Sequence, residues 1–151
     1  MRIKTAIAVL ILVCAGSTAW AGSADLKFKD IGGKPTDLGQ AKLITFWSSD
    51  CAPCLREMAI LPDIAKQNAD MPMALISLKD AEHTRARLTP MPENVQVLVA
   101  QDEGRAVLTA FGNERTLALP YSVMLNKKGG ICGKYYGIIS PDKIKEWRKE
   151  C

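Results

Sequence analysis

Short apolar runs alternate with longer amphipathic stretches along this chain of 151 residues. Apolar runs flanked by turn-forming residues are typical of buried strands, whereas apolar residues three or four positions apart indicate helices. On this pattern we expect strands at 43–47, 73–78, 95–100, 121–126 and 131–136. We expect helices at 55–67 and 81–88, between Asp102 and Gly112, and from Pro141 onward.

Turn and cap residues indicate where these strands and helices begin and end. Lys127-Lys128-Gly129-Gly130 indicates a β-hairpin between the last two strands, and Gly32-Gly33 indicates a shorter one near the start. Asp102 is predicted to cap the third helix, and Ser140 to cap the last. Strand–helix alternation that ends in a hairpin and a helix predicts an α/β fold, a central mixed β-sheet with helices on both faces.

The first 21 residues have the anatomy of a secretory signal peptide. Basic residues near the start precede an uncharged apolar run and a small-x-small cleavage pattern. We therefore expect cleavage after Ala21, which leaves one domain, residues 22–151, in the periplasm. Two alternatives stay open: an uncleaved membrane anchor and a lipoprotein modified at Cys14. The apolar run is shorter than the ~20 residues that cross a bilayer comfortably.

The charge balance limits the partners. The net charge falls from +4 to +2 when the predicted signal is removed, because that segment holds Arg2 and Lys4 and no acid. The remaining chain carries no basic stripe with interleaved aromatic residues, so nucleic acid is not an expected partner.

The motif Cys51-Ala52-Pro53-Cys54 joins the first strong strand to the helix that follows it. Two cysteines at this spacing can close a small disulfide ring, and the free N–H groups and dipole of a helix start favour the thiolate of the first. The placement predicts a reversible dithiol for disulfide exchange. A zinc site would need further ligands, yet the other cysteines are isolated and His83 is the only histidine. A static bridge usually closes a longer loop. We expect neither a metal nor an organic cofactor.

Residues 47–57, Trp-Ser-Ser-Asp-Cys-Ala-Pro-Cys-Leu-Arg-Glu, resemble the active-site segment of the TlpA, ResA and DsbE-like periplasmic thioredoxin-family thiol-disulfide oxidoreductases. Two downstream segments match that family in the same order, 102–112 and 119–130. The resemblance covers about 41–137 and implies a thioredoxin fold for the mature domain.

The resemblance also implies roles for four residues. Cys51 would be the attacking cysteine and Cys54 the resolving one. Pro120 would be the cis-proline that aligns a substrate strand, the alternative being an ordinary loop proline. Glu57 would be an acid near the dithiol, the alternative being a solvated surface acid beside Arg56.

Three positions near the dithiol bear on its chemistry. Asp50 stands where many relatives have tryptophan, and its carboxylate would raise the pKa of Cys51 against the helix dipole. The buried aspartate of true thioredoxins would fall near Thr45 and is absent. Trp47 would pack beneath the site.

The resulting prediction is an exported reductase of disulfides in extracytoplasmic proteins, with cytochrome c maturation as one candidate role. A membrane-bound thiol reductase is the implied electron donor. Strongly oxidising relatives usually have histidine before the second cysteine, and Pro53 cannot supply that charge. Two alternatives stay open: a disulfide-forming oxidase on the same fold, and a non-catalytic module in metal or haem-protein assembly.

The mature chain would hold two further cysteines. Cys132 lies in a predicted strand, where alternation puts it on the face of Lys134 and Tyr136. Cys151 continues the apolar stripe of the last helix, which is expected to pack on the sheet. We expect a structural disulfide between Cys132 and Cys151, favoured by an oxidising compartment. The alternative is two separate thiols.

Overall fold

The computed structural model of the protein describes residues 25–114 and 116–151. The predicted signal peptide, its cleavage after Ala21 and the alternative at Cys14 lie outside the described residues. The strands, in chain order, are β1 (Phe28–Asp30), β2 (Pro35–Thr36), β3 (Leu43–Trp47), β4 (Met73–Ser77), β5 (Val95–Ala100), β6 (Tyr121–Leu125) and β7 (Ile131–Tyr136). The helices are α1 (Ala52–Gln67), α2 (Ala81–Arg87), α3 (Gly104–Ala110) and α4 (Pro141–Glu150).

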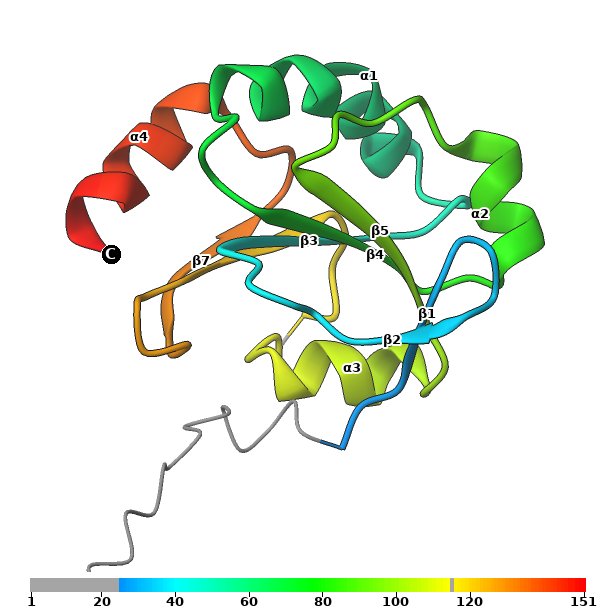
Figure 1. The fold of residues 1–151 in the computed structure, drawn as a ribbon. Helices are drawn as coiled ribbons and strands as arrows, with labels where there is room; N and C mark the ends of the chain where they lie inside the picture. The colour runs from blue at the N-terminus through cyan, green and yellow to red at the C-terminus, as the bar shows by residue number, and fades with distance from the viewer. Residues whose placement is uncertain (1–24, 115) are drawn as a thin grey trace, which may run out of the picture.

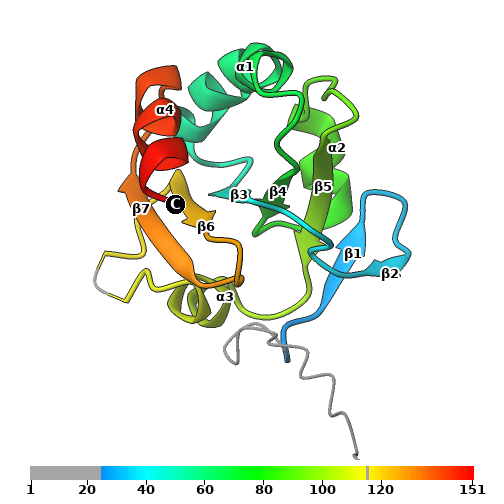
Figure 2. The same cartoon turned by 60° about the vertical axis from the view of Figure 1, so that its left-hand side comes forward.

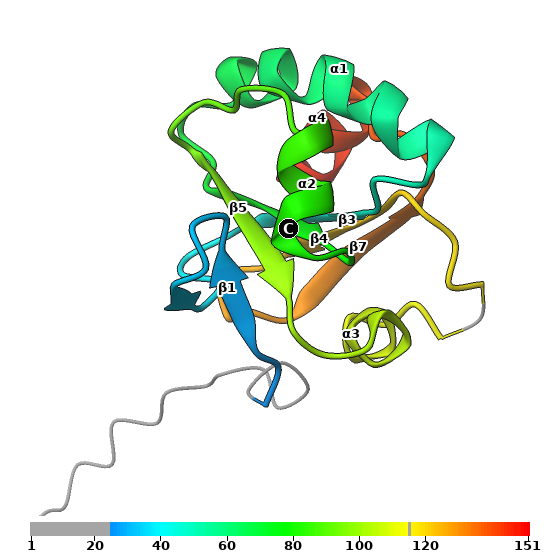
Figure 3. The ribbon, with the colours of Figure 1, turned by 90° about the vertical axis from the view of Figure 1, so that its right-hand side faces the viewer.

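The strands form one mixed sheet in the order β2-β1-β5-β4-β3-β6-β7. Strands β3, β4 and β5 are parallel, and the outer pairs are antiparallel. Helices α1 and α4 lie on one face of the sheet and α3 on the other (Figure 1). The same layers are seen from the β1 side in Figure 3. The predicted α/β fold is confirmed.

Central strands are buried on both faces, which is why their sequences read as continuous apolar runs. In β3 all five residues are buried. Leu43 and Trp47 belong to the apolar core under α1 and α4. Ile44 and Phe46 belong to the second core, which α3 covers. The strand therefore has fixed neighbours on both sides, and its carboxyl end leads directly to the cysteine motif.

Helix α1 begins earlier than its apolar periodicity predicts. Cys51 is its N-cap, with extended backbone, and Pro53 stands in its first turn, where a missing N–H costs nothing. The predicted start at Leu55 left the second cysteine outside the helix. In the structure Cys54 lies in the first turn and is buried against the sheet.

The start of α3 differs from the prediction. Its N-cap is Glu103, not Asp102, and no side chain caps the helix. The Asp102 carboxylate instead accepts the backbone N–H of Lys27 at 2.7 Å. This bond attaches the segment before β1 to the β5–α3 loop, so Asp102 serves tertiary structure rather than the helix. Gly112, with φ of 77°, follows the end of α3 as predicted.

Strand β7 is an edge strand with a β-bulge. Met124 pairs with Gly133, but the next residue of β6, Leu125, pairs with Ile131. Cys132 is thus an extra residue between two paired positions. A bulge of this kind interrupts the regular alternation of side chains between the two faces of a sheet.

The bulge brings Cys132 to the face that α4 covers. Cys132 forms a disulfide with Cys151, directly after α4, with the Cα atoms 5.8 Å apart. Figure 2 shows the end of α4 beside β7. Lys134 points to the other face, where its Nζ donates to the carbonyl oxygen of Gly112 at 3.1 Å. The prediction that Cys132 shares a face with Lys134 and Tyr136 is therefore wrong, whereas the predicted disulfide is present.

Candidate active site

The two cysteines of the motif form a disulfide at the start of α1. Their Cα atoms are 5.2 Å apart, and the Cys51 sulfur accepts the backbone N–H of Cys54 at 3.2 Å. Cys51 is partly exposed, whereas Cys54 is fully buried. A substrate disulfide can therefore approach Cys51 more readily than Cys54, in the order of attack that the resemblance implies.

The strand register brings a proline to the same end of the sheet. Phe46 of β3 pairs with Tyr121 of β6, so Pro120 lies at the carboxyl end of β3, from which the chain runs to Cys51. The Leu119–Pro120 peptide bond is cis, as the resemblance implies. The carbonyl oxygen of Pro120 accepts the backbone N–H of Gly137 at 2.9 Å, which fixes this turn to the end of β7.

Glu57 is a buried carboxyl group one helical turn after Cys54. Its side chain is 0% exposed, so the alternative of a solvated surface acid is wrong. One oxygen, Oε1, accepts the backbone N–H of Ile139 at 2.8 Å, and Oε2 has no hydrogen-bond partner among the described residues. Burial raises the pKa of Glu57 to about 7, although the Ile139 hydrogen bond opposes this. The site therefore holds a carboxyl group that gains or loses its proton near neutral pH.

Trp47 supports the dithiol from the core. It is fully buried and belongs to the same apolar cluster as Cys54, with Cys51 packed against that cluster. This agrees with the prediction that Trp47 packs beneath the site. At the position of the missing aspartate, the hydroxyls of Thr45 and Ser122 bond to each other at 2.9 Å, so the strand pair there is polar but uncharged.

An ion pair stands at the exposed side of the dithiol. The Asp50 carboxylate lies 2.5 Å from Lys79 Nζ, and the Ser49 hydroxyl donates to the same carboxylate at 3.4 Å. The hydrogen bond from Lys79 lowers the pKa of Asp50, and Asp50 in turn raises the pKa of Lys79. Sequence reasoning missed Lys79. Its position could have been predicted, because Lys79 follows β4, the parallel neighbour of β3, and loops at the carboxyl ends of neighbouring strands lie close together.

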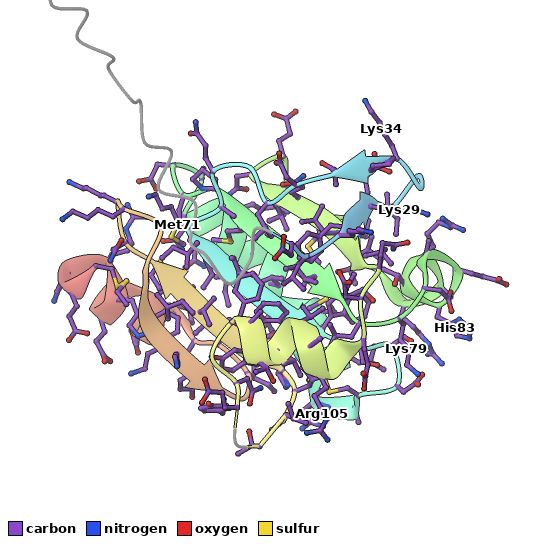
Figure 4. All side chains as sticks on the ribbon, turned by 90° about the horizontal axis from the view of Figure 1, so that it is seen from below. Lys29, Lys34, Met71, Lys79, His83 and Arg105 are labelled. Atoms are coloured by element: carbon purple, nitrogen blue, oxygen red, sulfur yellow. A yellow bond between two sulfur atoms is a disulfide. The ribbon has the colours of Figure 1, made fainter. Side chains whose placement is uncertain are left out.

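A second charged pair follows on α2. The Asp80 side chain caps α2 by accepting the backbone N–H of His83 at 3.0 Å, and it also bonds His83 Nδ1 at 2.7 Å. The backbone hydrogen bond from His83 helps to lower the pKa of Asp80 to about 2, and the side-chain bond raises the pKa of His83. Figure 4 shows Lys79 and His83 near each other at one margin of the molecule.

Within the described residues, 25–114 and 116–151, no three or more His, Cys, Asp or Glu side chains gather in an arrangement that could hold a metal ion. Nor does any helix there have the length and apolar character that crossing a membrane requires.

Comparison with known proteins gives matches over most of the chain. The Redoxin family model matches residues 21–147. The thiol-disulfide oxidoreductase ResA of Bacillus thuringiensis subsp. konkukian is 24% identical over 127 residues, which cover 80% of this chain and 71% of ResA. These matches confirm the resemblance drawn from the motif residues.

Solved structures give the same fold. A thioredoxin-related protein from Neisseria meningitidis serogroup B superposes with a TM-score of 0.68 at 19% identity, covering 81% of this chain and 96% of its own. The pneumococcal exposed lipoprotein thioredoxin of Streptococcus pneumoniae gives 0.64 at 20% identity, covering 83% and 98%. At sequence identities this low, the similarity establishes the fold and nothing about function.

Proposed function

Because this chain belongs to the Redoxin family and is a thiol-disulfide oxidoreductase of the thioredoxin fold, we propose that it is an exported reductase of disulfides in extracytoplasmic proteins. The observation that carries the proposal is the Cys51–Cys54 disulfide, in which Cys51 is partly exposed and Cys54 is buried. Export rests on the signal-like first 21 residues, which would leave residues 22–151 in the periplasm. The exposed lipoprotein among the structural relatives supports an extracytoplasmic location.

The proposed reaction proceeds in two exchanges. The Cys51 thiolate attacks one sulfur of the substrate disulfide, a mixed disulfide forms, and the other substrate sulfur leaves as a thiolate that takes up a proton. The Cys54 thiol then loses its proton, and its thiolate attacks the Cys51 sulfur. The Cys51–Cys54 bond forms and the second substrate thiol is released. The substrate has gained two electrons, and the protein has lost them.

Glu57 fits the proton transfer in the second exchange. It lies one turn from Cys54, and both side chains are buried, so water gives little help there. A carboxylate whose pKa lies near 7 can accept the Cys54 proton at neutral pH and return it afterwards. Pro120, at the same end of the sheet, is proposed to align the substrate strand beside Cys51.

The direction of electron flow rests on Pro53. A positively charged residue before the second cysteine would stabilise the thiolate and make the protein a stronger oxidant, and proline carries no charge. Once oxidised, the pair needs a two-electron donor, and a membrane-bound thiol reductase is the proposed one. Cytochrome c maturation is one route that would use such a reductase.

Insulin reduction and the redox potential test the proposal. The reduced protein should reduce insulin disulfides, Cys51→Ala should abolish this, and Cys54→Ala should accumulate a mixed disulfide that identifies the substrate. The potential should lie well below about −120 mV, the value of a strong oxidant. A potential near that value would favour the oxidase, and an inactive protein with an intact dithiol would favour the binding module.

A further inference from the structure

The exposed side of the dithiol carries an ion pair that the two proposed exchanges do not use. Asp50 directly precedes Cys51, and its side chain is 63% exposed, so nothing covers this carboxylate except its polar partners. An unbalanced negative charge next to a cysteine disfavours its thiolate. The structure shows that the charge is balanced by Lys79, from the neighbouring loop after β4.

The backbone arrangement makes the pair a fixed feature. Trp47 of β3 pairs with Ser77 of β4, so Asp50 and Lys79 follow directly paired strand ends. The backbone N–H of Leu78 donates to the carbonyl oxygen of Trp47 at 3.0 Å, which ties the two chain segments together just before the pair. Lys79 therefore reaches Asp50 from an anchored loop.

Other charged groups near this pair are few and identifiable. His83 of α2 interacts electrostatically with Asp50, and Asp80 holds His83 by a direct hydrogen bond. From α1, Glu57 is buried, and it accepts the backbone N–H of Ile139. Among the described residues, Lys79 is thus the charged group that bonds the Asp50 carboxylate directly, while His83 acts on it at longer range.

We propose that Lys79 is a positioning residue of the dithiol, which binds and neutralises Asp50 and thereby keeps Cys51 available as a thiolate. This rests on the proposed function only in taking Cys51 as the attacking sulfur. Without Lys79 the Asp50 carboxylate stands unpaired beside Cys51 and suppresses its ionisation. A unit charge in water, somewhat beyond direct contact, changes an ionisation equilibrium about threefold. We expect a loss of that size in the Cys51 thiolate fraction.

A double-mutant cycle tests the mechanism. The fully reduced protein is alkylated with iodoacetamide between pH 5 and pH 9, and the modification of Cys51 is followed by peptide mass spectrometry. Lys79→Met should slow Cys51 alkylation about threefold at pH values below the midpoint of the Cys51 titration. The double variant Asp50→Asn/Lys79→Met carries neither charge, so it should react at about the rate of the original protein. Asp50→Asn alone should not slow the reaction.

Controls separate charge from structure. Lys79→Arg keeps the positive charge and should react as the original protein does. Lys66→Met removes a lysine that pairs with Asp63 elsewhere on α1, and it should leave Cys51 unchanged. A double variant as slow as Lys79→Met alone would mean that the slowing does not come from the Asp50 carboxylate, and no slowing by Lys79→Met would also overturn the proposal. The readout is the thiol itself, so it holds even if the protein reduces no disulfide.

Discussion

Replacing Glu57 by glutamine should change how the stability of the protein depends on pH. Burial raises the pKa of this carboxyl group from 4.5 to about 7 in the folded protein. At about 1.4 kcal/mol per pH unit, this interval corresponds to about 3–4 kcal/mol. Glutamine is close in shape to the protonated acid, and its amide oxygen can still accept the backbone N–H of Ile139.

The sign follows from proton binding. Between pH 4.5 and about 7 the folded protein keeps the Glu57 proton that the unfolded chain has released, so the free energy of unfolding falls as the pH rises. Above about pH 7 both states are ionised, and the loss is complete. The free energy of unfolding of Glu57→Gln should therefore match that of the original protein near pH 4 and exceed it by about 3–4 kcal/mol at pH 8.

Urea unfolding of the oxidised protein at a series of pH values measures this difference. Keeping both disulfides closed removes any contribution from cysteine ionisation. Glu93→Gln, at an exposed position, is the matched control and should follow the original protein throughout. Parallel stability curves for Glu57→Gln and the original protein from pH 4 to pH 8 would refute the argument, because burial would then not oppose the Glu57 charge.

Three other predictions follow from the geometry. In the reduced protein, iodoacetamide should modify Cys51 faster than its buried partner, and equal rates would undo the assignment of roles. Replacing both Cys132 and Cys151 by serine should lower the free energy of unfolding by about 3 kcal/mol, because the bridge closes a loop with a separation of 19, while insulin reduction stays unchanged. Gly133→Ala would place a Cβ 2.4 Å from the Trp147 ring, so it should cost roughly 1–3 kcal/mol and change the tryptophan fluorescence; an unchanged melting temperature would contradict the packing.

The sheet was predictable because its central strands are mostly apolar. Val95–Ala100 and Leu43–Trp47 have the bounds that their sequence patterns predict. Pattern alone could not foresee Asp102, which is an ordinary capping residue by type but bonds a distant backbone N–H, that of Lys27. Nor could it foresee the bulge at Cys132, since a bulge depends on the partner strand.

The candidate site, too, was predictable only in part. Sequence motifs give the order of Cys51, Cys54 and Pro120 along the chain, and the structure brings them to one end of the sheet. The burial of Glu57 was left open, because it depends on the segment before α4 that covers it. Lys79 belongs to no sequence motif, and only the pairing of neighbouring strands brings it to Asp50, next to the dithiol.

Both edges of the sheet are poorly suited to receiving a strand from another molecule. An open edge exposes unpaired backbone groups that can template aggregation. Here one edge is β2, only two residues long, and the other is β7, whose bulge interrupts the regular row of donors and acceptors. The disulfide ties the bulged residue Cys132 to the end of α4, which helps to keep this edge from pairing with a second copy of the chain. Loss of the bridge would then affect solubility at high concentration as well as unfolding.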